Sequence, residues 1–219
     1  MLRVGEEQLE HDRAYGYLTA YAEDYGSTIE HYDLAGSAAS EVAPSTGPIS
    51  LSDLGRMVFI SARLSGDDAA ALISHTIDWS GIEPEARLED ADPDASDGLY
   101  AAMSRVWAQC TAISGIKRAK ASKLLHLKRP FAFPILDRDV RGTYKNRISG
   151  SGGVWRPVRE DLIAGREALE GLRRDLATSD EQLHRNAARL PTIRLLDILA
   201  WKLQHPGQRL HARRASDES

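Results

Sequence analysis

The stretch from Ile113 to Arg141 constrains the fold more than any other part of the chain. Gly115 occupies a place where a chain leaving one helix can turn without steric cost, because glycine tolerates positive φ. The apolar residues that follow recur at helical spacing and predict a cationic helix. Pro130 and Pro134 end that helix and hold the segment after them extended. Asp137 then stands where the N-cap of the next helix belongs.

Length and composition are those of a globular protein with one domain. The chain has 219 residues, of which 42% are apolar and 27% charged, and such a chain can bury a sizeable core. We expect a single domain over residues 1–205, followed by a flexible tail over 206–219. No apolar run approaches the roughly 20 residues of a membrane span, and the N-terminus lacks the apolar core of a signal peptide. A single cysteine, Cys110, excludes an internal disulfide. These features predict a cytoplasmic protein without a membrane partner, a bound metal or another cofactor.

Helical periodicity recurs along the chain, and no strand-like alternation of useful length interrupts it. The fold class expected is therefore all-α, a helical bundle. The helices expected cover about residues 5–33, 52–64, 67–79, 99–112, 119–128, 137–146, 160–177, 178–190 and 192–205. Ser52 or Asp53 is expected to cap the second helix, and Thr178 with Glu181 to form a capping box. Residues 34–50, 82–98 and the glycine-rich 149–153 are expected to be loops.

Two further patterns admit a structural and a functional interpretation. Tyrosines at helical spacing near the N-terminus, among them Tyr15, Tyr21 and Tyr25, can pack in the core or stack on bases. The acidic loop at residues 89–98 suggests calcium, but Ala95 stands at position six of the motif, where a glycine is needed. An acidic loop in solvent is therefore the better interpretation.

Charge is distributed unevenly. The net charge is −4, yet the segment from Lys117 to Arg147 holds ten Lys or Arg residues and only two acids. Such a segment is a candidate phosphate-facing surface. The alternative is that these side chains merely solvate the outward faces of helices.

Residues 113 to 121, Ile-Ser-Gly-Ile-Lys-Arg-Ala-Lys-Ala, resemble the hairpin of helix-hairpin-helix DNA glycosylases of the endonuclease III type. That hairpin reads roughly Leu-Pro-Gly-Val-Gly-Arg-Lys-Thr-Ala, and the two overlay without a gap. Ala119 takes the position of the family's lysine. The family's catalytic aspartate lies eighteen residues after this lysine, which is the position of Asp137. The overlay covers about residues 113 to 141. Residues 122–125, 128–130 and 195–201 also resemble an uncharacterised bacterial family of unknown function, which implies no activity.

The first resemblance implies a helix-hairpin-helix motif at about residues 99–127, in a DNA-glycosylase-like fold that binds duplex DNA. The residues expected to contact DNA are Gly115, Lys117, Arg118, Lys120 and Lys123. Asp137 would be the catalytic residue that releases a damaged base from a flipped-out nucleotide. Ala119 has no amine, so imine chemistry is not expected. The family's second hairpin glycine is Lys117 here, and its iron–sulfur cluster has no counterpart because Cys110 is single.

Three hypotheses about function therefore remain. The chain is a monofunctional DNA glycosylase, a non-catalytic scaffold that binds nucleic acid or protein, or a helical protein whose cationic segment binds nothing. Asp137 itself is either catalytic or only an N-cap, which would stabilise the helix by about 1 kcal/mol. A pocket lined by aromatic side chains beside Asp137 would favour the first hypothesis.

Overall fold

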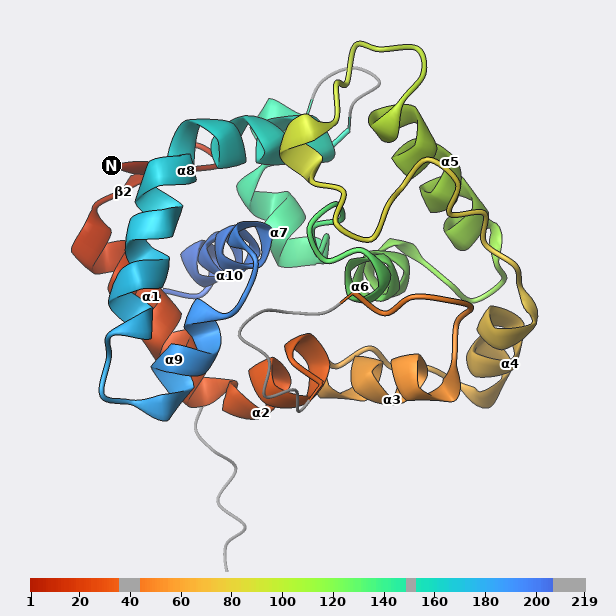
Figure 1. The fold of residues 1–219 in the computed structure, drawn as a ribbon, viewed down its shortest axis with the longest axis horizontal. Helices are drawn as coiled ribbons and strands as arrows, with labels where there is room; N and C mark the ends of the chain where they lie inside the picture. The colour runs from red at the N-terminus through yellow and green to blue at the C-terminus, as the bar shows by residue number, and fades with distance from the viewer. Residues whose placement is uncertain (36–43, 149–152, 207–219) are drawn as a thin grey trace, which may run out of the picture.

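The computed structural model describes residues 1–35, 44–148 and 153–206. Regular structure in these ranges is almost entirely helical (Figure 1), which confirms the all-α class. The α-helices are α1 (His11–Asp24), α2 (Gly26–Thr28), α3 (Leu51–Phe59), α4 (Gly66–Ser74), α5 (Leu99–Ala112), α6 (Arg118–Lys128), α7 (Arg138–Thr143), α8 (Trp155–Ala177), α9 (Gln182–Ala188) and α10 (Thr192–Gln204). A π-helix, η1 (Ile29–Asp33), follows α2, and η2 (Leu88–Asp90) and η3 (Lys145–Arg147) are short 3-10 helices.

The helices form two groups that lie side by side in Figure 1. Helices α1 and α8 pack on α10, and α9 packs on α1 and α8. Helices α3 and α5 pack against α6. The first group combines the beginning of the chain with its end, whereas the second comes from the middle. Helix α7 packs on α10, and η1 contacts both α3 and α9, so these two elements join the groups.

Helix α10 is the central element of the first group. Every residue from Thr192 to Ala200 is buried, as expected for a helix surrounded by other helices. The predicted start of this helix is confirmed, with Pro191 as its N-cap. Two charged residues of this stretch, Arg194 and Asp197, are buried, and both have partners that are described below.

The N-terminus differs from the expectation of a helix over residues 5–33. Strands β1 (Leu2–Val4) and β2 (Glu7–Leu9) form an antiparallel hairpin in which Leu2 pairs with Leu9. Gly5 adopts a φ of +65° at its turn. The hairpin forms because Leu2 is buried against α8 and its pairing partner Leu9 is buried as well. These tertiary contacts outweigh helical periodicity over so few residues.

Several helix boundaries also differ from those expected. Ser50, rather than Ser52 or Asp53, caps α3, and Asp53 completes its capping box. The capping box expected from Thr178 is wrong, because α9 begins after Glu181 without a side-chain cap. Helix α8 starts at Trp155, earlier than its leucine pattern indicated. Most of the glycine-rich loop (149–152) and of the expected tail (207–219) lie outside the described residues.

Helices α5 and α6 are joined by a tight turn at Gly115, whose φ of +80° agrees with the conformation expected for it. Asp68 in α4 stabilises this turn. Its Oδ2 atom lies 2.7 Å from Lys120 Nζ, which is also 3.2 Å from the carbonyl oxygen of Gly115. A Cβ atom added to Gly115 would lie 2.0 Å from Asp68 Oδ1. The turn therefore requires glycine for both its backbone conformation and its close contact with Asp68.

A buried ion pair connects α6 to α3. Lys128 is fully buried, and its Nζ lies 3.2 Å from Asp53 Oδ2 and 3.1 Å from both Ser45 Oγ and the Pro48 carbonyl oxygen. Burial alone would raise the pKa of Asp53. The hydrogen bonds from Ser45 and Ser50 and the charge of Lys128 outweigh that effect and lower the pKa.

We expect Gly115→Val to lower the free energy of unfolding by about 2 kcal/mol or more, because a β-branched residue is strained at positive φ and would clash with Asp68. Thermal and urea melts measure the loss. Gly16→Ala in α1 is the matched control, since a Cβ there meets nothing within 4 Å and should stabilise the helix by about 0.5–1 kcal/mol. An unchanged melt for Gly115→Val would contradict the turn geometry.

We expect Lys128→Met to reduce the free energy of unfolding by about 3–5 kcal/mol, because it leaves the buried Asp53 carboxylate without its cation. The pKa of Asp53 is lowered in the fold, so its contribution is present above the unfolded pKa of about 3.9 and is lost as the pH falls through the folded pKa. Without Lys128 the folded pKa of Asp53 lies closer to its unfolded value or above it, so urea melts from pH 7 to pH 3 should show a smaller acid-induced loss of stability in Lys128→Met than in the parent. Lys145→Met, at an exposed position, should change stability by less than about 0.5 kcal/mol.

Candidate functional site

A pocket of about 200 Å³ opens beside Asp137. It lies among the ends of α1 and α3, the middle of α6 and α10, and the extended segment that precedes α7. Its aromatic lining residues are Tyr21, Tyr25, Phe59 and Trp201. Its polar ones are Thr28, Ser61, Lys123, Asp137, Arg194 and Asp197. We refer to this cavity as the Asp137 pocket.

Three of the aromatic rings pack on one another. The rings of Tyr21 and Tyr25 are stacked with centroids 4.8 Å apart, and Trp201 meets Tyr25 edge to face at 5.5 Å. Tyr21 is buried, while Tyr25 and Trp201 are partly exposed. Tyr21 thus belongs to the core, as the structural interpretation predicts, and Tyr21 and Tyr25 also line the wall of a cavity.

Asp137 is the N-cap of α7, as the sequence predicts. Its Oδ1 atom accepts hydrogen bonds from the backbone N–H groups of Asp139 at 3.0 Å and Val140 at 2.9 Å. Its Oδ2 atom makes no hydrogen bond with any other described residue. One carboxylate oxygen therefore fixes the side chain as the helix cap, and the other makes no bond that would hold it within the described part of the chain.

Lys123 reaches the Asp137 pocket from α6. Its Nζ donates to the carbonyl oxygen of Ile60 at 2.7 Å. Burial lowers the pKa of Lys123, while the negative charge of Asp137 opposes that shift. The sequence predicts that Lys123 contacts DNA, and the structure places its amine in the lining of the Asp137 pocket.

The end of α3 forms one wall of the Asp137 pocket. Thr28 Oγ1 donates to the carbonyl oxygen of Phe59 at 2.8 Å, and Lys123 Nζ donates to the carbonyl oxygen of Ile60. Ser61 follows with a φ of +56°, a conformation usually taken by glycine after a helix. The N–H of Ser61 donates to Val58 and that of Ala62 to Met57, which completes a Schellman motif.

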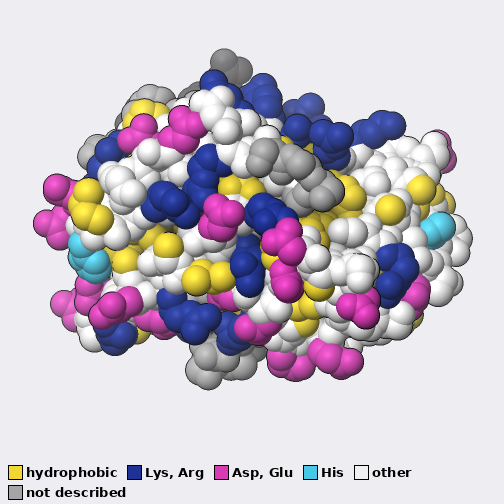
Figure 2. Space-filling model, turned by 90° about the horizontal axis from the view of Figure 1, so that it is seen from above, with side chains coloured by type: hydrophobic (Ala, Val, Ile, Leu, Met, Phe, Trp, Pro, Cys, Tyr) yellow, Lys and Arg dark blue, Asp and Glu magenta, His cyan; other side chains and the backbone are white. Residues whose placement is uncertain are grey.

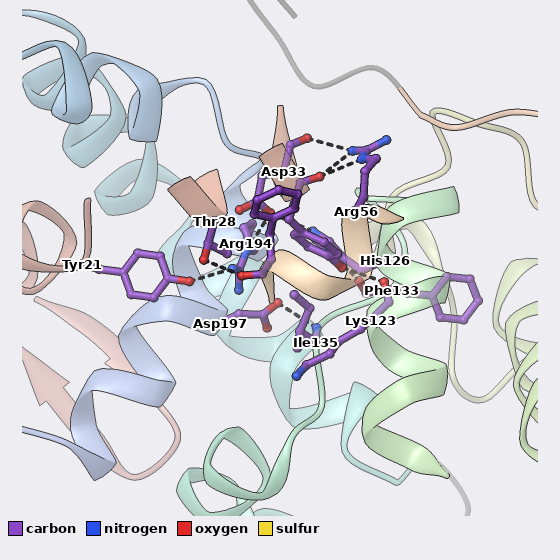
Figure 3. Close-up of polar contacts among 12 residues, drawn as sticks. Tyr21, Thr28, Asp33, Arg56, Lys123, His126, Phe133, Ile135, Arg194 and Asp197 are labelled. Atoms are coloured by element: carbon purple, nitrogen blue, oxygen red, sulfur yellow. Dashed lines mark hydrogen bonds and ion pairs between the residues drawn. The ribbon is translucent and has the colours of Figure 1, made fainter. Parts of the chain in front are cut away.

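Arg194 lies at the centre of a buried polar network behind the pocket (Figure 3). Its Nε donates to Asp33 Oδ1 and its Nη2 to the hydroxyl of Tyr21, both at 3.0 Å. Burial disfavours its charge, but the neighbouring Asp33, together with Tyr21, raises the pKa of Arg194 above its usual value. The network therefore ties α10 to α1 and η1.

Asp197 lies one turn further along α10 and positions the segment that carries Asp137. Its Oδ2 accepts a hydrogen bond of 2.8 Å from the backbone N–H of Ile135. Burial raises the pKa of Asp197 well above its usual value, and the charges of Asp137 and Asp33 act in the same direction, although Arg194 opposes them. The pocket thus contains two carboxyl groups in different environments, and that of Asp197 favours the neutral acid.

The cationic segment presents less free charge than its sequence suggests. Six of its ten Lys and Arg residues have partners within the fold, namely Lys120, Lys123, Lys128, Arg129, Arg138 and Arg147. The other four are Lys117, Arg118, Arg141 and Lys145. Figure 2 shows Lys and Arg side chains close together along the upper edge of that view. Among the residues expected to contact DNA, Lys117 and Arg118 are exposed near Gly115, whereas Lys120 is paired with Asp68.

Sequence reasoning did not identify Arg194 or Asp197 as site residues. The sequence nevertheless contained a signal for both, since Arg194 and Asp197 stand in an otherwise apolar helix. Charged residues are almost never fully buried unless they are paired, so a buried helix with two charges implies partners for them. His126 is buried, and its Nδ1 donates to the carbonyl oxygen of Phe133 at 2.7 Å. Burial lowers the pKa of His126 to about 3, so it is neutral.

Within the described ranges no cluster of three or more His, Cys, Asp or Glu side chains is arranged to hold a metal ion. The helices of these ranges are also all too short or too polar to cross a membrane.

The chain belongs to a family of unknown function, DUF6308, whose sequence profile matches residues 13–204. This match confirms the resemblance to an uncharacterised family. Comparisons with curated proteins and with solved structures gave no significant match. The resemblance to helix-hairpin-helix glycosylases thus has no counterpart in these comparisons.

We expect Ser61→Gly to stabilise the fold by about 1 kcal/mol, because glycine adopts the positive φ of this position without strain. For a chain of this size the melting temperature should rise by about 2–4 °C. Ser61→Ala is the control, since it removes the hydroxyl group but keeps the strain and should not stabilise. An equal rise in both variants would show that the hydroxyl group, not the backbone, is unfavourable.

Proposed function

We propose that this protein binds duplex DNA and releases a base that enters the Asp137 pocket. The observation that carries the proposal is the free carboxylate oxygen of Asp137 beside an aromatic-lined cavity. Aromatic rings stack on nucleobases of any sequence, and enzymes that act on a base take it out of the duplex into such a pocket. The turn at Gly115 between α5 and α6 would be the helix-hairpin-helix motif, with Lys117 and Arg118 beside the DNA backbone.

The size of the Asp137 pocket supports a small planar ligand. Its volume of about 200 Å³ is below the roughly 300–1,000 Å³ of pockets for drug-sized molecules. A single nucleobase is a ligand of the appropriate shape, because it offers a flat face to Tyr25 and Trp201 and polar edges to the surrounding side chains.

The reaction proposed is hydrolysis of the bond between the sugar and the base. The electron pair of that bond leaves with the base, and water adds to the sugar carbon and loses a proton. Asp137 would stabilise the positive charge that develops on the sugar or accept the proton from water. Asp197, whose raised pKa favours the neutral acid, would supply a proton to the departing base.

Lys123 modifies the expectation that no imine forms. Ala119 has no amine, but the lowered pKa of Lys123 favours a neutral amine within the Asp137 pocket. Any covalent adduct with an opened sugar would therefore depend on Lys123, and borohydride trapping of the parent and of Lys123→Met tests this directly.

The second candidate function is a non-catalytic scaffold that binds nucleic acid or protein. It is favoured by the internal pairing of Lys120, Lys128 and Arg147, which reduces the charge left for phosphates. Under this alternative Asp137 is only the N-cap of α7.

The proposal is tested with Asp137→Asn. Asparagine caps a helix about as well as aspartate, so stability and DNA affinity should be retained. Base release from a panel of damaged duplexes should fall by at least about a hundredfold, because the negative charge is lost. Duplex affinity of the parent should fall steeply with salt, and Lys117→Ala with Arg118→Ala should weaken it for all sequences.

Lys120 is left unchanged in that experiment because its pairing with Asp68 stabilises the turn. Duplex binding without base release from any substrate, in a protein that retains its fold, would favour the scaffold. Base release that survives Asp137→Asn would exclude Asp137 as the catalytic residue. Failure to bind duplex DNA even at low salt would remove both nucleic-acid hypotheses.

A further inference from the structure

A second and larger cavity, of about 430 Å³, lies on the other side of the segment that precedes α7. Leu136 lines this cavity, whereas its neighbours Ile135 and Asp137 line the Asp137 pocket, so one extended segment forms a wall of both. The residues that line this cavity include Tyr100, Trp107, Arg118, Arg141 and Trp155. We refer to this cavity as the Trp155 pocket.

Aromatic rings form much of the wall of the Trp155 pocket. Trp155 is buried, and it meets Tyr100 at 5.7 Å and Trp107 at 5.6 Å, both edge to face. Trp107 is only half-buried. A partly exposed indole held by a second one is a rigid stacking surface for a flat ring.

Two guanidinium groups that have no partner among the described residues line the same cavity. Arg118 begins α6 and Arg141 lies in α7, and neither side chain makes a hydrogen bond or ion pair with another described residue. By contrast, the guanidinium group of Arg129 donates to the carbonyl oxygens of Ile82 and Lys128. Free guanidinium groups are suited to bidentate recognition of a phosphate.

The lining of the Trp155 pocket also includes no Asp or Glu. Its charge is therefore positive and suits an anion. A phosphate monoester carries a charge of about −1.5 to −2 at neutral pH. As a ligand for two guanidinium groups it therefore balances their charge better than a ligand with a single carboxylate would. The volume of about 430 Å³ falls within the roughly 300–1,000 Å³ of pockets that bind small molecules.

We propose that the Trp155 pocket binds a nucleotide, with its base against Trp107 and Trp155 and its phosphate between Arg118 and Arg141. The nucleotide is either a free nucleoside monophosphate or one unit of a nucleic-acid strand. The proposal does not depend on base release in the Asp137 pocket, because the two cavities have separate polar residues.

The test is a titration of the full chain with four probes, in which binding is measured by calorimetry and by tryptophan fluorescence. The probes are adenosine monophosphate, adenosine, inorganic phosphate and a short single strand of deoxyadenosine. Adenosine monophosphate should bind at least about tenfold more tightly than adenosine or phosphate, because only it uses both the rings and the guanidinium groups. Arg141→Gln should weaken it by about tenfold or more for the same reason.

Two variants serve as matched controls. Arg138→Gln changes a side chain on the same helix that is 90% exposed and does not line the pocket. Lys145→Gln changes an exposed residue of the cationic segment that is likewise absent from the lining. Both should bind adenosine monophosphate as the parent does, whereas Trp107→Leu should weaken adenosine monophosphate and leave inorganic phosphate unaffected.

The strand distinguishes the two sources. Tighter binding of the strand than of the monophosphate, with the same dependence on Arg141, identifies a nucleic acid, and weaker binding identifies a free nucleotide. Equal affinity for adenosine and its monophosphate, binding unaffected by Arg141→Gln, or no binding of either nucleotide probe at millimolar concentration in a folded protein would overturn the proposal. Duplex binding that persists in such a case would leave the proposed function standing.

Discussion

The arrangement of this protein depends on one buried cation, the guanidinium group of Arg194 in α10. Removing a charge from water costs several kcal/mol unless partners compensate for it. Here Asp33 and Tyr21 do so, each at 3.0 Å. These partners come from η1 and α1, about 160 residues earlier in the chain. Because the partners must reach Arg194, the beginning and the end of the chain are held together around α10.

The same helix determines where the candidate site lies. Asp197 binds the backbone N–H of Ile135, and Trp201 lines the Asp137 pocket one turn further on. The extended segment is thereby fixed against α10, and Asp137 follows it directly. Ser61, which has a strained positive φ, and Lys123, whose Nζ donates a hydrogen bond to the carbonyl oxygen of Ile60, line the same pocket. Polar groups with raised or lowered pKa values, a backbone outlier and a cavity thus coincide, which is a combination typical of functional sites.

Local patterns in the sequence were sufficient wherever the physical cause was local. The turn at Gly115, the cap at Asp137 and the start of α10 at Pro191 each follow from the conformational preferences of one or two residues. The N-terminal hairpin and the internal pairing of part of the cationic segment were not predicted, for a common reason. Burial of Leu2 against α8, and the pairing of Lys128 with Asp53, are contacts between distant residues that no local pattern specifies.

The sequence by itself determined the all-α class, most helices and the N-cap position of Asp137, because helical periodicity, proline and capping act over a few residues. Tertiary structure alone decided that Tyr21, Lys123 and Asp197 meet beside Asp137, and that Arg118 and Arg141 face a second cavity lined by indole rings. A cavity is the space left between elements that are far apart in the chain. Its lining therefore depends on how those helices pack, and that packing is fixed by buried pairs such as Arg194 and Asp33.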